Sequence, residues 1–138
     1  MGGKSQGKAE FLSKGNANFV RLQGNVTTAN NGGFLQIRTA VYNLEKELEG
    51  LLLKVRGNGQ RYYVFVRTSG TLMPWQYYKA DFPSEKNWAE VKLQFKDFVR
   101  SSSWLAKTIR PESIKSIGIV AFGRDHNALI DVADLQFF

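Results

Sequence analysis

Short apolar or alternating segments, separated by residues that favour turns, make up most of this chain. About nine of them occur, from EFLS at 10–13 to ALIDVADLQFF at the C-terminal end, and each has the length of an ordinary strand. Glycine, asparagine, serine and proline stand between them, and no long amphipathic segments alternate with them. Many short strands joined by turns predict an all-β protein, an antiparallel sandwich or barrel, because an α/β fold needs helices between its strands.

Two segments interrupt this pattern. Residues 41–49, VYNLEKELE, repeat Val41, Leu44 and Leu48 at helical spacing, and we interpret them as a connecting loop with at most two turns of helix. Residues 99–113 are polar and contain a proline, so we expect them to cross between the two sheets.

Length and composition predict a single domain over residues 1–138. Of the 138 residues, 43% are hydrophobic, which is enough to form one core. The net charge of +7 favours anionic partners such as nucleic acid, acidic protein surfaces or membranes. The chain has no cysteine, which excludes disulfides, thiol catalysis and cysteine-ligated zinc. No segment resembles a signal peptide or a membrane span, and we expect a cytoplasmic protein.

Asn58-Gly59 is the strongest local turn signal in the chain. Both residues tolerate the positive φ that a two-residue type I′ turn needs. The dipeptide therefore predicts a hairpin in which residues 50–56 and 61–68 are adjacent strands.

The register of this hairpin separates its side chains into two faces. The face predicted to be buried contains Leu51, Leu53, Val55, Tyr62, Val64 and Val66. The opposite face is basic and aromatic and contains Lys54, Arg56, Arg61, Tyr63 and Arg67. Arg56 would lie opposite Arg61, so we expect Arg56→Ala to change stability by less than about 1 kcal/mol. If Arg56 is instead clamped in a buried ion pair with an acid, its removal should cost several kcal/mol and the arginine is structural.

A second alternating segment, residues 75–82, adds to the basic and aromatic face. Trp75, Tyr77 and Lys79 share one side of this segment. If they join the basic face of the hairpin, flat aromatic surface lies beside charged donors, which suits a sugar or a polar protein partner. In the alternative interpretation, Trp75 and Tyr77 only cover the edge of a sheet.

Nucleic-acid binding and catalysis find less support. RYYVFVRT is similar to the aromatic strand of RNA-recognition domains, but Tyr62 stands in the place of that motif's glycine and no βαββαβ frame surrounds it. GGKSQGK is nearly a phosphate-binding loop, but Ala9 replaces the Ser or Thr that binds magnesium. His126 is the only histidine, and the carboxylates are scattered singly. We therefore expect no enzymatic activity, no cofactor and no metal.

Several segments together resemble the complex I intermediate-associated protein 30 family. They are MGGKSQG, NNGGFLQIRT at 30–39, GLLLKVRGNGQRYYVFVRT, YYKADF, NWAEVKLQFKDF and IKSIGIVAFGR, in that order. The most specific are Asn31-Gly32-Gly33-Phe34 with Arg38, and the VRGNGQRY stretch. The resemblance implies a galactose-binding-like jelly-roll β-sandwich and, by analogy with mitochondrial members, a role in assembling respiratory complex I. Family members usually have a short segment before the MGG, so it also implies that a first strand or a targeting segment is missing here.

These observations predict a non-enzymatic binding module that holds another protein as an assembly or scaffolding factor. Carbohydrate binding is the alternative, and nucleic-acid binding through the basic face is the third hypothesis. The residues predicted to bind the ligand or partner are Arg38, Lys54, Arg56, Arg61, Tyr63, Arg67, Trp75 and Tyr77.

Overall fold

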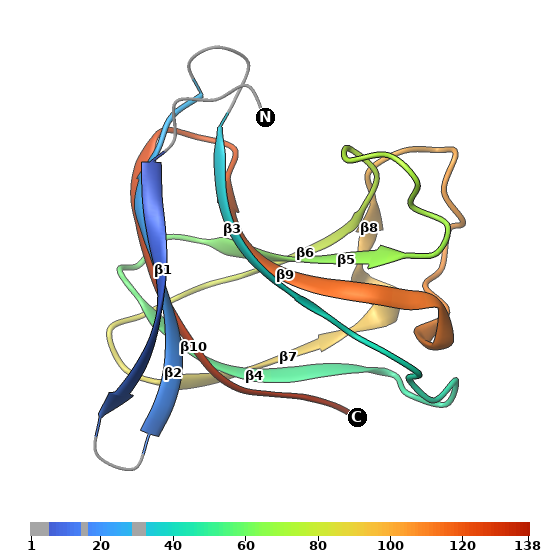
Figure 1. Cartoon of the computed structure of the whole chain (residues 1–138), viewed down its shortest axis with the longest axis horizontal. Helices are drawn as coiled ribbons and strands as arrows, with labels where there is room; N and C mark the ends of the chain where they lie inside the picture. Colours follow the sequence, from blue (N-terminus) through green and yellow to red (C-terminus); the bar gives the residue numbers. More distant parts are fainter. Residues whose placement is uncertain (1–5, 15–16, 29–32) are drawn as a thin grey trace.

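The protein is a sandwich of two five-stranded antiparallel sheets (Figure 1). The computed structural model describes residues 6–14, 17–28 and 33–138. Sheet A has the order β1 (Gln6–Lys14), β2 (Ala17–Val26), β10 (His126–Phe137), β4 (Gly50–Gly57) and β7 (Ala89–Gln94). Sheet B has the order β3 (Phe34–Ala40), β9 (Ile114–Phe122), β5 (Tyr62–Thr68), β6 (Tyr78–Phe82) and β8 (Val99–Arg100). The predicted all-β antiparallel sandwich is confirmed.

The core lies between the sheets and contains the side chains that alternation assigned to it. Leu51, Leu53 and Val55 point inward from β4, and each is at most 1% exposed. Tyr62, Val64 and Val66 point inward from β5, and each is fully buried. The predicted buried face is therefore confirmed for both strands, because alternate residues of a strand point to the same side of its sheet.

The predicted hairpin between these two strands is wrong. β4 pairs with β10 and β7 in sheet A, whereas β5 pairs with β9 and β6 in sheet B. The turn at Asn58-Gly59 carries the chain from one sheet to the other, and Figure 1 shows β4 and β5 in different layers. None of the predicted cross-strand pairs forms, including the one between Arg56 and Arg61.

Hydrogen bonds, including two to distant segments, hold this turn between the sheets. The Asn58 side chain donates from Nδ2 to the Asn127 carbonyl at 2.8 Å and accepts at Oδ1 from the Tyr62 hydroxyl at 2.6 Å. The backbone N–H of Gly57 donates to the Glu85 carbonyl at 2.6 Å. Tertiary partners therefore satisfy the polar groups that a hairpin would have paired locally, and the local turn preference does not decide which strands pair.

The connecting segments are irregular, with two short 3₁₀ helices, η1 (Phe95–Asp97) and η2 (Pro111–Ser113). Residues 41–49 form a loop without a helix, as predicted. Residues 99–113 do not cross between the sheets, because they run from β8 to β9 within sheet B. The chain crosses earlier, at η1 between β7 and β8. No helix among the described residues is long and apolar enough to span a membrane.

Candidate binding face

The crossover at Asn58-Gly59 divides the predicted site between two sides of the molecule. Lys54 and Arg56 lie on β4, on the outer face of sheet A. The other six residues belong to sheet B or to its loops: Arg38 on β3, Arg61 directly before β5, Tyr63 and Arg67 on β5, Trp75 in the β5–β6 loop and Tyr77 directly before β6. The single basic and aromatic face that was predicted is therefore two separate surfaces.

On sheet B, four aromatic rings form a continuous layer over the outer face. Tyr77 stacks on Phe65, with ring centroids 4.0 Å apart and planes 7° apart. Phe65 meets Phe122 edge to face at 5.2 Å, and Tyr63 meets Phe122 at 4.6 Å. Such pairs gain energy beyond the area that they bury. We call Tyr63, Phe65, Tyr77 and Phe122 the aromatic face.

Strand register explains how these rings meet. Tyr63 lies opposite Val120 and Phe65 lies opposite Gly118 in the β5–β9 pair. A Cβ added at Gly118 would come within 3.1 Å of the Gln36 side-chain oxygen, so that side chain would have to shift. The face therefore depends on β9, which is about 50 residues from β5 along the chain.

Two cations border the aromatic face. The Arg67 guanidinium lies 5.8 Å from the Phe65 and Tyr77 ring centroids, and Lys79 Nζ lies 5.7 Å from that of Phe122. These distances are within the range of cation–π attraction. Arg61 lies farther out and pairs with Asp81 at 2.8 Å on the exposed edge.

Arg67 carries its charge without an acidic partner among the described residues. Its guanidinium donates to the Pro74 carbonyl at 3.3 Å and to Gln36 Oε1 at 3.5 Å. Burial lowers the pKa of Arg67, and the charge of Arg38 lowers it further. Burial has the opposite effect on Tyr77, whose pKa it raises, and the charge of Arg67 partly offsets this rise. An incoming anionic group would therefore relieve an electrostatic cost at this position.

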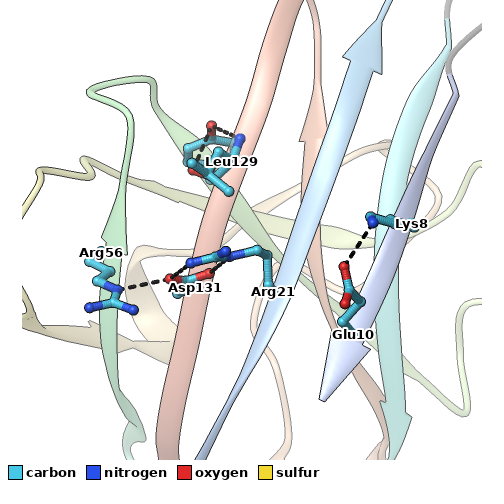
Figure 2. A network of polar contacts seen from close by, with 7 residues as sticks. Lys8, Glu10, Arg21, Arg56, Leu129 and Asp131 are labelled. Carbon is cyan, nitrogen blue, oxygen red and sulfur yellow. Dashed lines mark hydrogen bonds and ion pairs between the residues drawn. The ribbon is translucent and has the colours of Figure 1, made fainter. Parts of the chain in front are cut away.

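Arg56, on the other sheet, has a structural role. Asp131 on β10 lies between Arg56 on β4 and Arg21 on β2, as Figure 2 shows. Arg56 Nε donates to Asp131 at 2.8 Å, and Arg21 donates to both carboxylate oxygens, at 2.8 and 3.0 Å. The Asp131 side chain is only 3% exposed. The structure therefore shows the alternative arrangement, in which Arg56 forms an ion pair with a buried acid.

Two aromatic rings also pack against Arg56. Its guanidinium lies 4.7 Å from the Trp88 ring centroid and 5.0 Å from that of Phe19. Lys54, two residues earlier, remains exposed and forms a 3.6 Å ion pair with Asp134. Arg56 is therefore held by contacts within the protein, with 28% of its side chain exposed, and Lys54 lies apart from the aromatic face.

His126, the first residue of β10, contacts a backbone carbonyl and an aromatic ring. Its Nδ1 lies 2.8 Å from the Arg124 carbonyl, which fixes that nitrogen as a donor. The ring lies 6.2 Å from that of Tyr62. Among the described residues, no three His, Asp or Glu side chains are grouped so as to hold a metal ion.

The sequence interpretation omitted three residues of the site. Phe65 shares its side of β5 with Tyr63 and Arg67, so strand alternation was a sufficient signal for it. Lys79 was placed beside Tyr77 but was not selected. Phe122 gave no local signal, because only the pairing of β9 with β5 brings it to Tyr63.

A separate apolar cleft of about 700 Å³ lies between the two sheets. Its lining comes from β1, β2 and β10 on one side and from β3 and β9 on the other, including Leu12, Val20, Ile37, Ile119 and Val132. Of the eight predicted site residues, only Arg38 reaches it. The cleft is therefore distinct from the aromatic face.

Comparison with known proteins identifies a sequence family and similar folds. The family model described as complex I intermediate-associated protein 30 (CIA30) matches residues 1–130. No curated protein sequence matches the chain.

Among solved structures, carbohydrate-binding modules of Clostridium thermocellum are similar. The family 11 module of the cellulosomal cellulase Lic26A-Cel5E has a TM-score of 0.80 and 11% identity, covering 99% of this chain and 84% of that chain. A family 11 module in complex with a β-1,3-1,4-mixed-linked tetrasaccharide has a TM-score of 0.79 and 11% identity, covering 99% and 85%. The family 30 module of cellulase Cel9D-Cel44B has a TM-score of 0.64 and 11% identity, covering 100% and 92%. The likeness shows a shared jelly-roll sandwich, and at this identity it extends to the fold alone.

Proposed function

The chain belongs to the complex I intermediate-associated protein 30 family, and on this premise we propose that it is a non-enzymatic binding module that holds another protein on the aromatic face of sheet B. In this role it acts as an assembly or scaffolding factor. The observation that carries the proposal is Arg67, a half-buried cation without an acidic partner among the described residues, which lies against the Phe65 and Tyr77 rings.

The composition of the face matches a protein interface. Aromatic residues and arginine dominate the energetic centres of such interfaces, and charged groups surround them. Here Tyr63, Tyr77 and Phe122 are partly exposed and form the centre, and Phe65 supports them from a buried position. Arg67, Lys79 and Arg38 supply positive charge beside it. The partner that fits is a protein segment with an apolar centre and at least one carboxylate placed to reach Arg67.

Affinity capture from the source cell, with mass spectrometry of the captured proteins, tests the proposal. Arg67→Gln and Lys79→Ala should each reduce capture of the same partner at least about tenfold, the effect of removing a central interface contact. Lys54→Ala is the matched control, because it removes an exposed cation from sheet A. Full capture by Arg67→Gln, or an equal loss with Lys54→Ala, would overturn the assignment of this face.

Carbohydrate binding is the second candidate, supported by the aromatic layer and by the solved family 11 module that holds a mixed-linked tetrasaccharide. The ring geometry favours it less. Phe65 is only 5% exposed, and Tyr77 uses one face of its ring to stack on Phe65, so only the other face of Tyr77 is left for a sugar ring. Affinity electrophoresis in mixed-linked β-glucan separates the two functions. If the glucan retards the wild-type chain but not Tyr77→Ala, the ligand of the aromatic face is a glycan and not a protein.

A further inference from the structure

Two neighbouring loops at one end of sheet B display large apolar side chains to solvent. The β5–β6 loop exposes 81% of Leu72, 49% of Met73 and 66% of Trp75, and the loop after β8 exposes 89% of Trp104. Both loops lie at the same end of the sandwich (Figure 1). We call these four residues the end-loop patch. Single exposed apolar residues are ordinary, but four on adjoining loops indicate an interaction surface.

Hydrogen bonds join the two loops. The Ser101 hydroxyl donates to the Trp75 carbonyl at 2.9 Å and accepts from the backbone N–H of Tyr77 at 3.0 Å. The backbone N–H of Ser101 also donates to the Tyr77 carbonyl at 2.8 Å. The two loops therefore form one surface.

Each loop is also braced internally. Gln76 Oε1 accepts from the backbone N–H groups of Leu72 and Met73, at 2.9 and 3.0 Å. In the second loop, Arg100 donates to the Leu105 carbonyl at 2.9 Å, and the Tyr78 hydroxyl donates to the Ala106 carbonyl at 2.6 Å. These bonds pair backbone groups of both loops while the apolar side chains remain exposed.

The two segments that contain the patch carry cations and no acid. No Asp or Glu occurs in residues 62–80 or in residues 98–111. The same segments carry five cations, which are Arg67, Lys79, Arg100, Lys107 and Arg110. Lys107 and Arg110 are exposed and lie in the same loop as Trp104. The patch is therefore apolar, with two exposed cations, Lys107 and Arg110, in the Trp104 loop. Asp81, Asp97 and Glu112 directly flank the two acid-free segments.

From this combination we propose that the end-loop patch docks the protein on the surface of an anionic phospholipid bilayer. Tryptophan prefers the boundary between headgroups and acyl chains, where its ring is apolar and its N–H reaches water. Leu72 and Met73 would insert to the same depth, while Lys107 and Arg110 approach the lipid phosphates. Side chains that project from two loops can insert into a bilayer, because lipids rearrange around them. The proposal goes beyond partner binding and uses a different set of residues from the aromatic face.

Co-sedimentation of the full chain with unilamellar vesicles tests the proposal. The wild type should bind vesicles of phosphatidylcholine mixed with phosphatidylserine, and raising salt should weaken binding because it screens the cations. The double variant Leu72→Ser, Trp104→Ser should bind at least about tenfold more weakly. Lys107→Glu combined with Arg110→Glu should also weaken binding to these vesicles.

Tyr42→Ser provides the matched control, since it removes an aromatic side chain that is 78% exposed from a loop outside the patch. It should leave binding unchanged, and the melting temperatures of all these variants should match the wild type. Tyr63→Ala, on the aromatic face, should lose partner capture and keep vesicle binding, so the two proposals fail separately. Tryptophan emission should shift to the blue on vesicles and should shift less in Trp104→Phe.

Three results would overturn the proposal. The first is failure of the wild type to bind anionic vesicles. The second is equal binding to vesicles of phosphatidylcholine alone. The third is a loss of protein capture in Leu72→Ser, Trp104→Ser with no change in vesicle binding, which would make the patch a protein interface.

Discussion

Arg56 and Asp131 face each other across β4 and β10, and Arg56 Nε donates a 2.8 Å hydrogen bond to the aspartate. Arg21, on the opposite neighbouring strand, donates two further hydrogen bonds to the same carboxylate (Figure 2). One nearly buried anion therefore joins three adjacent strands of sheet A. This arrangement replaces the predicted contact between Arg56 and Arg61, and it reverses the expected effect of removing Arg56.

Arg56→Ala should lower the free energy of unfolding by about 1.5 to 3 kcal/mol, the usual value of a hydrogen bond to a charged group. Arg21 continues to satisfy Asp131, which keeps the loss below that of an unpaired buried charge. Chemical denaturation measures the change. The control is Lys54→Ala on the same strand, whose exposed ion pair should be worth less than about 1 kcal/mol. Equal stability of the two variants would show that the Asp131 network contributes nothing.

The Asp131 network also makes stability depend on pH. Burial alone would raise the pKa of Asp131, but the hydrogen bonds and charges of Arg21 and Arg56 outweigh burial and hold this pKa below its ordinary value. A carboxylate with a lowered folded pKa stabilises the protein above its unfolded pKa, and this contribution is lost as pH falls through the folded pKa. Unfolding measured from about pH 5 downward should therefore show a shallower acid loss in Asp131→Asn than in the wild type.

The matched control for the pH experiment is Asp134→Asn, which removes a largely exposed carboxylate from the same strand. This variant should retain the acid dependence of the wild type. If Asp131→Asn also retains it, the lowered pKa of Asp131 contributes no stability.

Tyr62→Phe should destabilise the fold by about 1 to 3 kcal/mol, because it removes a hydroxyl that is hydrogen-bonded to partly buried groups. That hydroxyl accepts from the Leu129 N–H at 2.9 Å and donates to Asn58 Oδ1 at 2.6 Å, so it ties the sheet crossing to β10. Thermal unfolding measures the loss. Tyr63→Phe, one residue along on the outer face, serves as the control. A smaller effect at position 62 than at position 63 would contradict this role of the hydroxyl.

Leu53→Ala should cost about 2 to 5 kcal/mol, as other deletions of large core side chains do. Leu53 is 1% exposed, between the sheets. Leu52→Ala, on the outer side of β4, should cost less because Leu52 is only partly buried. Urea denaturation of both variants compares the two sides of the strand, and a reversed order would contradict the assigned inward face.

Strand alternation determined which side of each strand is apolar, and the structure confirms it for β4 and β5. A strand turns successive side chains to opposite faces, so the inward position of Leu53 or Val64 depends only on its immediate neighbours in the sequence. The same local rule placed Tyr63 and Arg67 together on an outer face. The all-β class followed from similarly local signals, the lengths of the segments and the turn residues between them.

Tertiary structure alone decided which strands are neighbours. Alternation relates a side chain to its own strand and contains no information about the sheet that the strand joins. The hairpin predicted from Asn58-Gly59 is therefore wrong for this fold. Gly59 has a positive φ but Asn58 does not, and the Asn58 side chain bonds to Asn127 and Tyr62. Arg56 forms its ion pair with Asp131, which is 75 residues away in the sequence, and the Tyr63 ring packs against Phe122 on β9. The partners of both residues come from non-local packing, which is why one arginine is structural and the aromatic face lies on the opposite sheet.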